Sequence, residues 1–297
     1  MVYIVLFAFG LAVGSFLNVV SLRYRPDRGV FEFSRINGRS HCSHCKRTLR
    51  WYELVPLLSY VVLLGRCRTC RARLSLQYPI VEFLGGAAAL AIPLFFARFF
   101  SVGALFPFRA ELTGLYLFSF LWVVVLLIFI LISVIDFRHY VIPNELNVFI
   151  GVLGVGAVLV KLFLSGSWLL PFSHYFVGSY AILLSPFGGV LANHAAGFAV
   201  GGLFFWLIVF VTRGRAMGMG DVKLAAALGL LMGLPDILLV IFFAFLFGGV
   251  AGVFTILLGK KTMKSMIPFG PFIVLGALIT LFFGQRAIAW YFTLFVG

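Results

Sequence analysis

The chain has 297 residues, of which 63% are hydrophobic and only 11% charged, and its mean hydropathy is +1.13. Soluble domains carry about 25% charged residues, so this composition excludes a water-soluble globule. The apolar residues come in runs of about 20, the length at which a helix crosses a bilayer core of roughly 30 Å. We therefore expect an all-α polytopic membrane protein in contact with lipid. The net charge of +14 is explained by membrane topology, and nucleic acid is not an expected partner.

The apolar runs predict about eight transmembrane segments. We expect these to be helices, because lipid offers no hydrogen-bond partners to backbone groups that are left unpaired. They run near 3–21, 79–99, 115–135, 146–165, 194–212, 220–235, 237–258 and 269–292. The sixth is short and rich in glycine. Basic residues gather after the first span and in the later loops on the same side, so both termini are expected outside. Segment 166–193 is apolar but broken by proline and glycine, and we expect an external loop with an interfacial or re-entrant piece.

The chain divides into a first transmembrane helix (1–21), a basic cytoplasmic loop (22–78) and a membrane core (79–297). All four cysteines lie in the loop, as Cys42-Ser-His-Cys45 and Cys67-Arg-Thr-Cys70. This spacing predicts a zinc-knuckle loop, with structural Zn²⁺ bound by Cys42, Cys45, Cys67 and Cys70. Disulfides or free thiols are the alternatives, and a reducing cytoplasmic face disfavours disulfides. A closed site of four thiolates folds the loop and leaves no position for catalysis.

Two of the nine acidic residues, Asp136 and Asp221, lie at ends of spans that the topology places on the same cytoplasmic side. An ionisable group at such a place is costly and usually functional or paired. Two carboxyls brought close share one proton, which is the state that aspartyl proteolysis needs. The structural alternative is that Asp136 pairs with Arg138 and Asp221 caps the sixth helix.

Two other functions use the same features. A transporter would employ Asp136 and Asp221 as a proton or ion relay. A non-enzymatic scaffold would bind a partner through the zinc-folded loop, but it leaves the twin aspartates unexplained. Among the remaining charged groups, Glu82 is expected to pair with arginines of the loop, and Lys161 and Asp236 are placed at outside ends of spans.

Several motifs along the chain resemble one family. Gly218-Met-Gly-Asp221 resembles the GxGD signature of membrane aspartyl peptidases, and the segment from Asp136 to Asn144 resembles the first aspartate motif of bacterial type IV prepilin peptidases. Further similar motifs, in family order, are Gly14–Val20, the paired CxxC loop, Pro56–Tyr60, Tyr78–Glu82 and Ile267–Phe272. Asn144 stands where members of the family often carry Asp.

The resemblance implies an enzyme of the bacterial inner (cytoplasmic) membrane, with Asp136 and Asp221 as its catalytic pair and 79–297 as its peptidase core. Its substrates would be type IV prepilins and type II secretion pseudopilins, whose leader peptides are cut at the cytoplasmic face. The family then methylates the new N-terminus with S-adenosylmethionine, and the cysteine loop is associated with that step. The sequence has no glycine-rich cofactor fingerprint, so the residues that would bind S-adenosylmethionine are not indicated.

Overall fold

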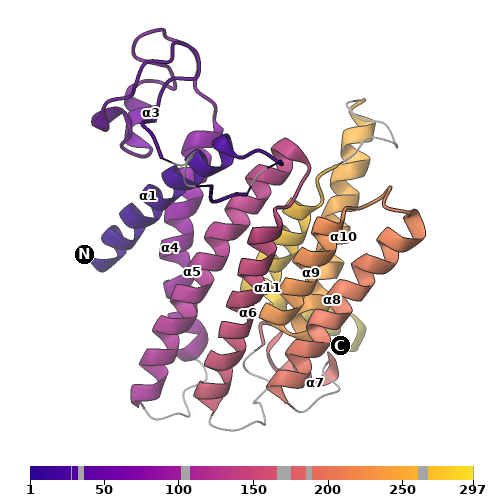
Figure 1. Cartoon of the computed structure of the whole chain (residues 1–297). Coiled ribbons are helices and arrows are strands. Elements are labelled where there is room, and N and C mark those ends of the chain that lie inside the picture. Colours follow the sequence, from indigo (N-terminus) through magenta and orange to yellow (C-terminus); the bar gives the residue numbers. More distant parts are fainter. Residues whose placement is uncertain are drawn as a thin grey trace.

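The computed structural model describes residues 1–27, 29–32, 37–101, 108–165, 175–184, 189–259 and 267–296. In these residues the regular structure is helical apart from isolated β-bridges. The long helices are α1 (Val2–Arg23), α4 (Gln77–Ser101), α5 (Phe108–His139), α6 (Asn144–Ser165), α8 (Val190–Thr212), α10 (Leu234–Leu257) and α11 (Gly270–Val296). The short ones are η1 (Trp51–Glu53), α3 (Leu58–Val62), η3 (Gly178–Tyr180), α7 (Ala181–Leu184) and α9 (Met219–Met232). Figure 1 shows the cysteine loop at one end of the bundle and α7 at the other.

Seven helices of the described chain are long and apolar enough to cross a membrane, so the expected all-α membrane fold is confirmed. The sixth expected span, 220–235, corresponds to α9, which has only 14 residues. Such a helix is about 21 Å long, shorter than the hydrocarbon core of a bilayer. It ends at Gly233, where the backbone takes a φ of +98° that glycine adopts readily.

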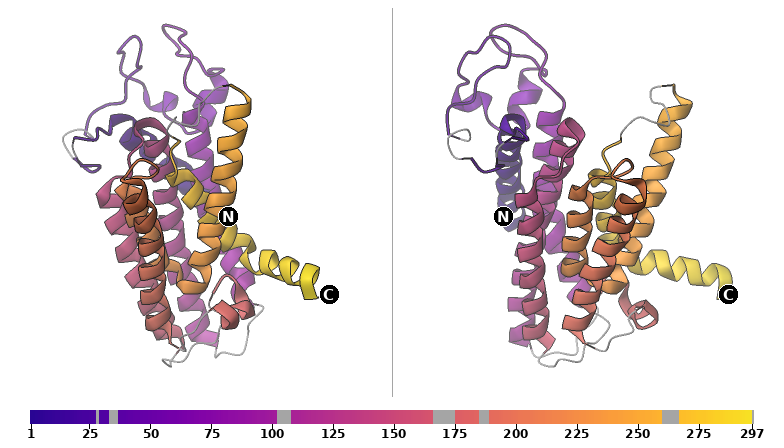
Figure 2. Two further views of the ribbon diagram at one scale, coloured as in Figure 1. Left: turned by 90° about the vertical axis from the view of Figure 1, so that its right-hand side faces the viewer. Right: turned by 45° about the vertical axis from the view of Figure 1, so that its right-hand side comes forward.

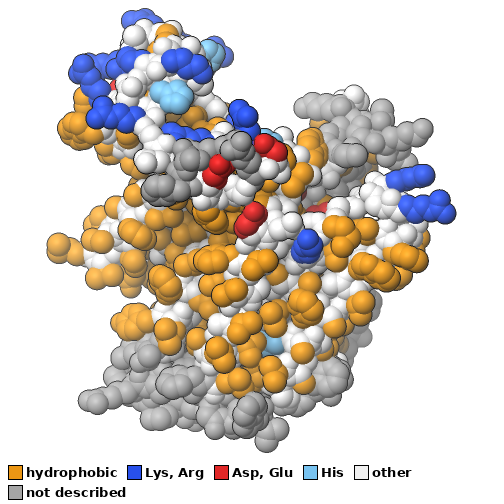
Figure 3. All heavy atoms as spheres, viewed as in Figure 1, with side chains coloured by type: hydrophobic (Ala, Val, Ile, Leu, Met, Phe, Trp, Pro, Cys, Tyr) orange, Lys and Arg blue, Asp and Glu red, His pale blue; other side chains and the backbone are white. Residues whose placement is uncertain are grey.

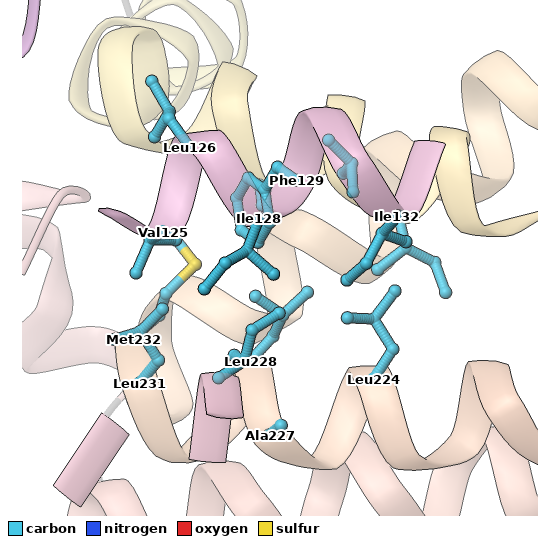
Figure 4. Close-up of a cluster of buried hydrophobic side chains, with 14 of the residues drawn as sticks. Val125, Leu126, Ile128, Phe129, Ile132, Leu224, Ala227, Leu228, Leu231 and Met232 are labelled. Atoms are coloured by element: carbon cyan, nitrogen blue, oxygen red, sulfur yellow. The ribbon is translucent and has the colours of Figure 1, made fainter. Parts of the chain in front are cut away.

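Helix α9 lies inside the bundle, where most of its side chains are buried. A Cβ atom on Gly229 of α9 would lie 2.0 Å from the carbonyl oxygen of Gly197 in α8. Only glycine on both helices therefore permits so close an approach. On another side, apolar side chains of α5 face those of α9 in Figure 4, with Ile128 and Ile132 opposite Leu228 and Leu224. The two views of Figure 2 show the long helices side by side in the bundle, with the yellow C-terminal end of α11 projecting away from it.

Residues 175–184 enter the bundle at the end opposite the cysteine loop. They form only η3 and α7, and they do not cross the bundle. Tyr175 and Val177 are fully buried, and the Phe176 ring packs edge-on against Trp122 of α5 with the ring centroids 5.2 Å apart. The last residues of the expected loop, 190–193, belong to α8 instead, and residues 166–174 and 185–188 lie outside the described residues.

Candidate functional site

Asp136 lies in the last turn of α5 and is buried, with 4% of its surface exposed. The backbone N–H of Gly270, the first residue of α11, donates a hydrogen bond to its Oδ2 over 3.0 Å. A Cβ atom at Gly270 would stand 2.7 Å from that same oxygen, so glycine leaves the space the carboxyl occupies. The described hydrogen bond of Asp136 thus goes to the last span and not to Arg138.

Asp221 occupies the third position of α9 and is also buried, with 8% of its surface exposed. Its Oδ2 accepts a hydrogen bond over 3.1 Å from the backbone N–H of Gly218, the N-cap residue. The capping role considered for Asp221 is therefore present. It employs one carboxyl oxygen and leaves the other available for chemistry.

Ile142 connects the surroundings of the two aspartates. It follows the end of α5, and a Cβ atom at Gly220 would lie 3.1 Å from the Cβ of Ile142. A Cβ atom at Gly270 would lie 3.0 Å from the Cδ1 of the same isoleucine. Ile142 thus lies beside Gly270, which binds Asp136, and beside Gly220, which precedes Asp221. The structure therefore brings together two aspartates that are separated in the sequence by the long helices α6 and α8.

Two side chains of α6 hold the second aspartate motif against the first. Lys223 Nζ donates to Asn144 Oδ1 over 2.8 Å, and Asn147 Nδ2 donates to the carbonyl oxygen of Gly220 over 3.4 Å. Asn147 is buried, and sequence analysis did not single it out. Asn147 lies three residues after Asn144, so both side chains occupy one face of α6. This spacing is the sequence signal that could have identified Asn147.

The four cysteines meet in one cluster, with their sulfur atoms all within 4.8 Å of one another. Both knuckles repeat one backbone pattern, in which the N–H of the first cysteine bonds the carbonyl five residues later. The residue after each second cysteine, Lys46 and Arg71, has a positive φ that closes the turn. Backbone N–H groups of Cys70 and Thr69 lower the pKa of the Cys67 thiol to about 6, which favours the thiolate. This donor set suits a tetrahedral metal ion.

Two buried carboxylates stabilise the cysteine loop. One bonds the loop to the helix bundle, and the other makes contacts within the loop. Glu82 of α4 accepts the backbone N–H of Leu57 over 2.9 Å, so its described partner is a backbone group and not the arginine that we expected. Glu53 pairs with the Arg47 guanidinium and accepts the N–H of Arg50 over 2.8 Å. Burial raises the pKa of Glu53, but these hydrogen bonds outweigh burial and hold the pKa below its ordinary value.

A second buried polar cluster lies at the opposite end of the bundle. Lys161 of α6, His194 of α8 and Asp236 of α10 are almost completely buried. Lys161 and Asp236 lie at the end of the bundle where they were expected, but their burial was not predicted. Lys161 Nζ lies 3.1 Å from His194 Nε2, and His194 Nδ1 lies 2.7 Å from the Leu230 carbonyl oxygen. Because an ammonium only donates, Nε2 accepts and Nδ1–H donates. Asp236 accepts the N–H groups of Phe176 and Val177 over 3.1 and 3.0 Å.

Two family models match this chain. One covers the region of the cysteine cluster, and the other covers the region of the two aspartates. The model of the bacterial peptidase A24 N-terminal domain matches residues 8–96, which include the four cysteines. The model of the type IV leader peptidase family matches residues 122–253, which include Asp136 and Asp221.

Similar proteins match over nearly the whole chain. A prepilin leader peptidase/N-methyltransferase of Aeromonas hydrophila is 31% identical over 98% of this chain and 93% of its own length. The protein of that name from Bacillus subtilis (strain 168) is 30% identical over 99% of both chains. That of Legionella pneumophila is 28% identical over 97% of this chain and 94% of its own. No solved structure matches.

Proposed function

Because the chain belongs to the type IV leader peptidase family, we propose that it cleaves the leader peptides of type IV prepilins and of type II secretion pseudopilins. Asp136 and Asp221 are the proposed catalytic pair. The observation that supports this assignment best is that both aspartates are buried at one end of the bundle, next to glycines that both approach Ile142.

The proposed chemistry follows from the sharing of one proton between neighbouring carboxyls. The ionised carboxyl takes a proton from the attacking water, while the protonated one donates a hydrogen bond to the oxygen of the scissile carbonyl. Each side chain already has its Oδ2 held by a backbone N–H, from Gly270 or Gly218. In the proposed reaction the other oxygen of each carboxyl acts on water and substrate, and the fixed Oδ2 atoms reduce the reorganisation that the site needs.

The position of the pair suits a substrate that is itself anchored in lipid. Asp136 and Asp221 lie at the ends of α5 and α9 nearest the cysteine loop, the end proposed as cytoplasmic. The apolar helix of a pilin precursor would lie in the bilayer beside the enzyme, with its basic leader on the cytoplasmic side. There the leader is attracted to the anionic inner leaflet of the bacterial inner membrane.

We also propose that the enzyme methylates the new N-terminus. The relatives are named as bifunctional, and the chain matches them through the cysteine loop as well as the membrane core. Cys42, Cys45, Cys67 and Cys70 would hold a structural Zn²⁺, because four clustered thiols match the donor set of closed zinc sites. S-adenosylmethionine would supply the methyl group. The transporter hypothesis is not favoured, since the matched relatives are leader peptidases.

Mass spectrometry of a prepilin incubated with purified enzyme and S-adenosylmethionine tests both activities. We expect the wild-type enzyme to release the leader and to add a methyl group to the product. Asp136→Asn and Asp221→Asn should leave the precursor intact, while Asp27→Asn, which neutralises a carboxyl in the loop, should cleave normally. Normal cleavage by either dyad variant would remove that aspartate from the mechanism.

Replacement of a cysteine separates the two activities. We expect Cys42→Ser or Cys70→Ser to lower the bound zinc and the methylation while cleavage persists at least in part. A product that never gains a methyl group with the intact enzyme would exclude the second activity.

A further inference from the structure

Helix α3 exposes an apolar face in a loop that is otherwise strongly basic. Leu58, Val61 and Val62 are 65%, 66% and 77% exposed. They are spaced as i, i+3 and i+4 and therefore occupy one side of the helix. The adjoining Leu54 and Leu64 are exposed as well, and Tyr60 faces inward, with its hydroxyl donating to the Leu74 carbonyl oxygen over 3.5 Å. A contiguous apolar patch of this kind marks an interaction surface.

The attachment of α3 to the bundle sets its height relative to the membrane. Leu57, the residue before α3, donates its backbone N–H to Glu82, which is only five residues into α4. Leu57 is the centre of a tight turn with a φ of +59°, in which the Leu58 N–H bonds the Pro56 carbonyl oxygen. A non-glycine residue keeps so rare a conformation only where its surroundings enforce it. The start of α3 is thus held at the level of the first turns of α4.

At that level the surface of α4 is already apolar, as expected for a surface that faces lipid. Ile80, Phe83 and Leu84 in its first two turns are all exposed apolar side chains. The apolar face of α3 is therefore at the height where the lipid-facing surface of the bundle begins. Figure 3 shows hydrophobic side chains at the lower left edge of the upper lobe, with Lys and Arg side chains above them.

The charge around α3 indicates what kind of surface it meets. In the described loop, exposed cations lie on both sides of α3 in sequence, among them Lys46, Arg50, Arg66, Arg68 and Arg73. An apolar helix face flanked by cations is typical of segments that lie in the interface of an anionic bilayer. We propose that the α3 face inserts into the cytoplasmic leaflet of an anionic bilayer and holds the cysteine loop against the membrane surface.

Photocrosslinking of the full-length enzyme in vesicles tests this contact. p-Benzoylphenylalanine is placed at Val62, and at the exposed Thr69 of the second knuckle as the matched control. The vesicles contain phosphatidylcholine with or without phosphatidylglycerol. We expect lipid adducts at Val62, more of them with phosphatidylglycerol, and few at Thr69. An adduct of Val62 with a second copy of the chain or with added prepilin, or no excess over Thr69, would overturn the proposal.

A charge on the face provides an independent readout. We expect Val62→Asp to increase hydrogen–deuterium exchange in the peptide spanning α3 in vesicles, whereas Val62→Ile should not. Bound zinc should stay unchanged in both variants, because the thiol cluster is left intact. Equal exchange in the two variants would contradict insertion. Loss of methylation with retained cleavage in Val62→Asp is also expected, but this readout rests on the proposed function, whereas exchange and lipid adducts do not.

Discussion

Replacement of Gly270 by alanine tests whether the position of the Asp136 carboxyl controls the reaction rate. The new Cβ atom would stand 2.7 Å from Oδ2 and 3.3 Å from Cγ of Asp136, and 3.0 Å from Cδ1 of Ile142. Ordinary contacts of a Cβ atom begin near 3.4 Å. The carboxyl must therefore move by roughly 0.7 Å, which distorts its hydrogen bond with the Gly270 N–H, and displacements of about 1 Å can cost a hundredfold in rate.

The expected magnitude follows from the interaction that is weakened. Hydrogen bonds to charged groups contribute about 1.5–3 kcal/mol, and each 1.4 kcal/mol on the barrier is about tenfold in rate. We expect kcat for leader cleavage to fall by about 10- to 100-fold. KM should change little, because Gly270 acts on the carboxyl and not on the substrate. Alanine is a good helix former, so α11 itself should remain stable.

The assay is steady-state cleavage of a prepilin by the wild type, Gly270→Ala and a matched control. Gly151→Ala serves as the control, because a Cβ atom at this position of α6 would meet nothing within 4 Å. Thermal unfolding of all three proteins in the same detergent shows whether the fold is kept. A Gly270→Ala enzyme that cleaves at the wild-type rate would refute the reasoning, as would an equal loss in Gly151→Ala.

Three further predictions concern buried polar contacts. Asn147→Leu removes the hydrogen bond to Gly220 and should lower kcat by about fivefold, the effect of about 1 kcal/mol, with stability largely kept; an unchanged kcat would contradict this role. Asp236→Ala leaves two buried N–H groups without an acceptor and should destabilise the protein by about 2 kcal/mol or more. Thermal unfolding measures this loss, and an unfolding midpoint equal to that of the wild type would contradict the prediction. Because the pKa of Glu53 is held below its ordinary value of 4.5, its contribution is present above that value and is lost as the pH falls through the folded pKa. Protection factors for hydrogen exchange in the cysteine loop, taken relative to the intrinsic exchange rate at each pH, should therefore fall on acidification in the wild type, but should depend less on pH in Glu53→Gln.

Features that depend on short stretches of chain could be predicted from the sequence. Apolar runs of about 20 residues indicated the membrane helices, since the length of a run alone decides whether it can cross lipid. The spacing of the Cys42 and Cys67 pairs predicted a shared cluster, because each knuckle is built from neighbouring residues. The positive-inside rule placed Asp136 and Asp221 on one side, and the structure brings them together at one end of the bundle.

Contacts between distant segments appeared only in the tertiary structure. Nothing near Asp136 in sequence indicates that Gly270 would hold its carboxyl, and Lys161 and Asp236 looked like ordinary residues at the ends of spans. Local patterns were enough to predict a membrane-embedded helical protein with a cysteine cluster and two acids on one side. The tertiary structure decided that α9 is a short buried helix, which polar groups are buried, and which face of α3 stays open. The physical reason is that burial, close glycine contacts and hydrogen bonds between helices depend on how separate segments pack, and local patterns do not encode that packing.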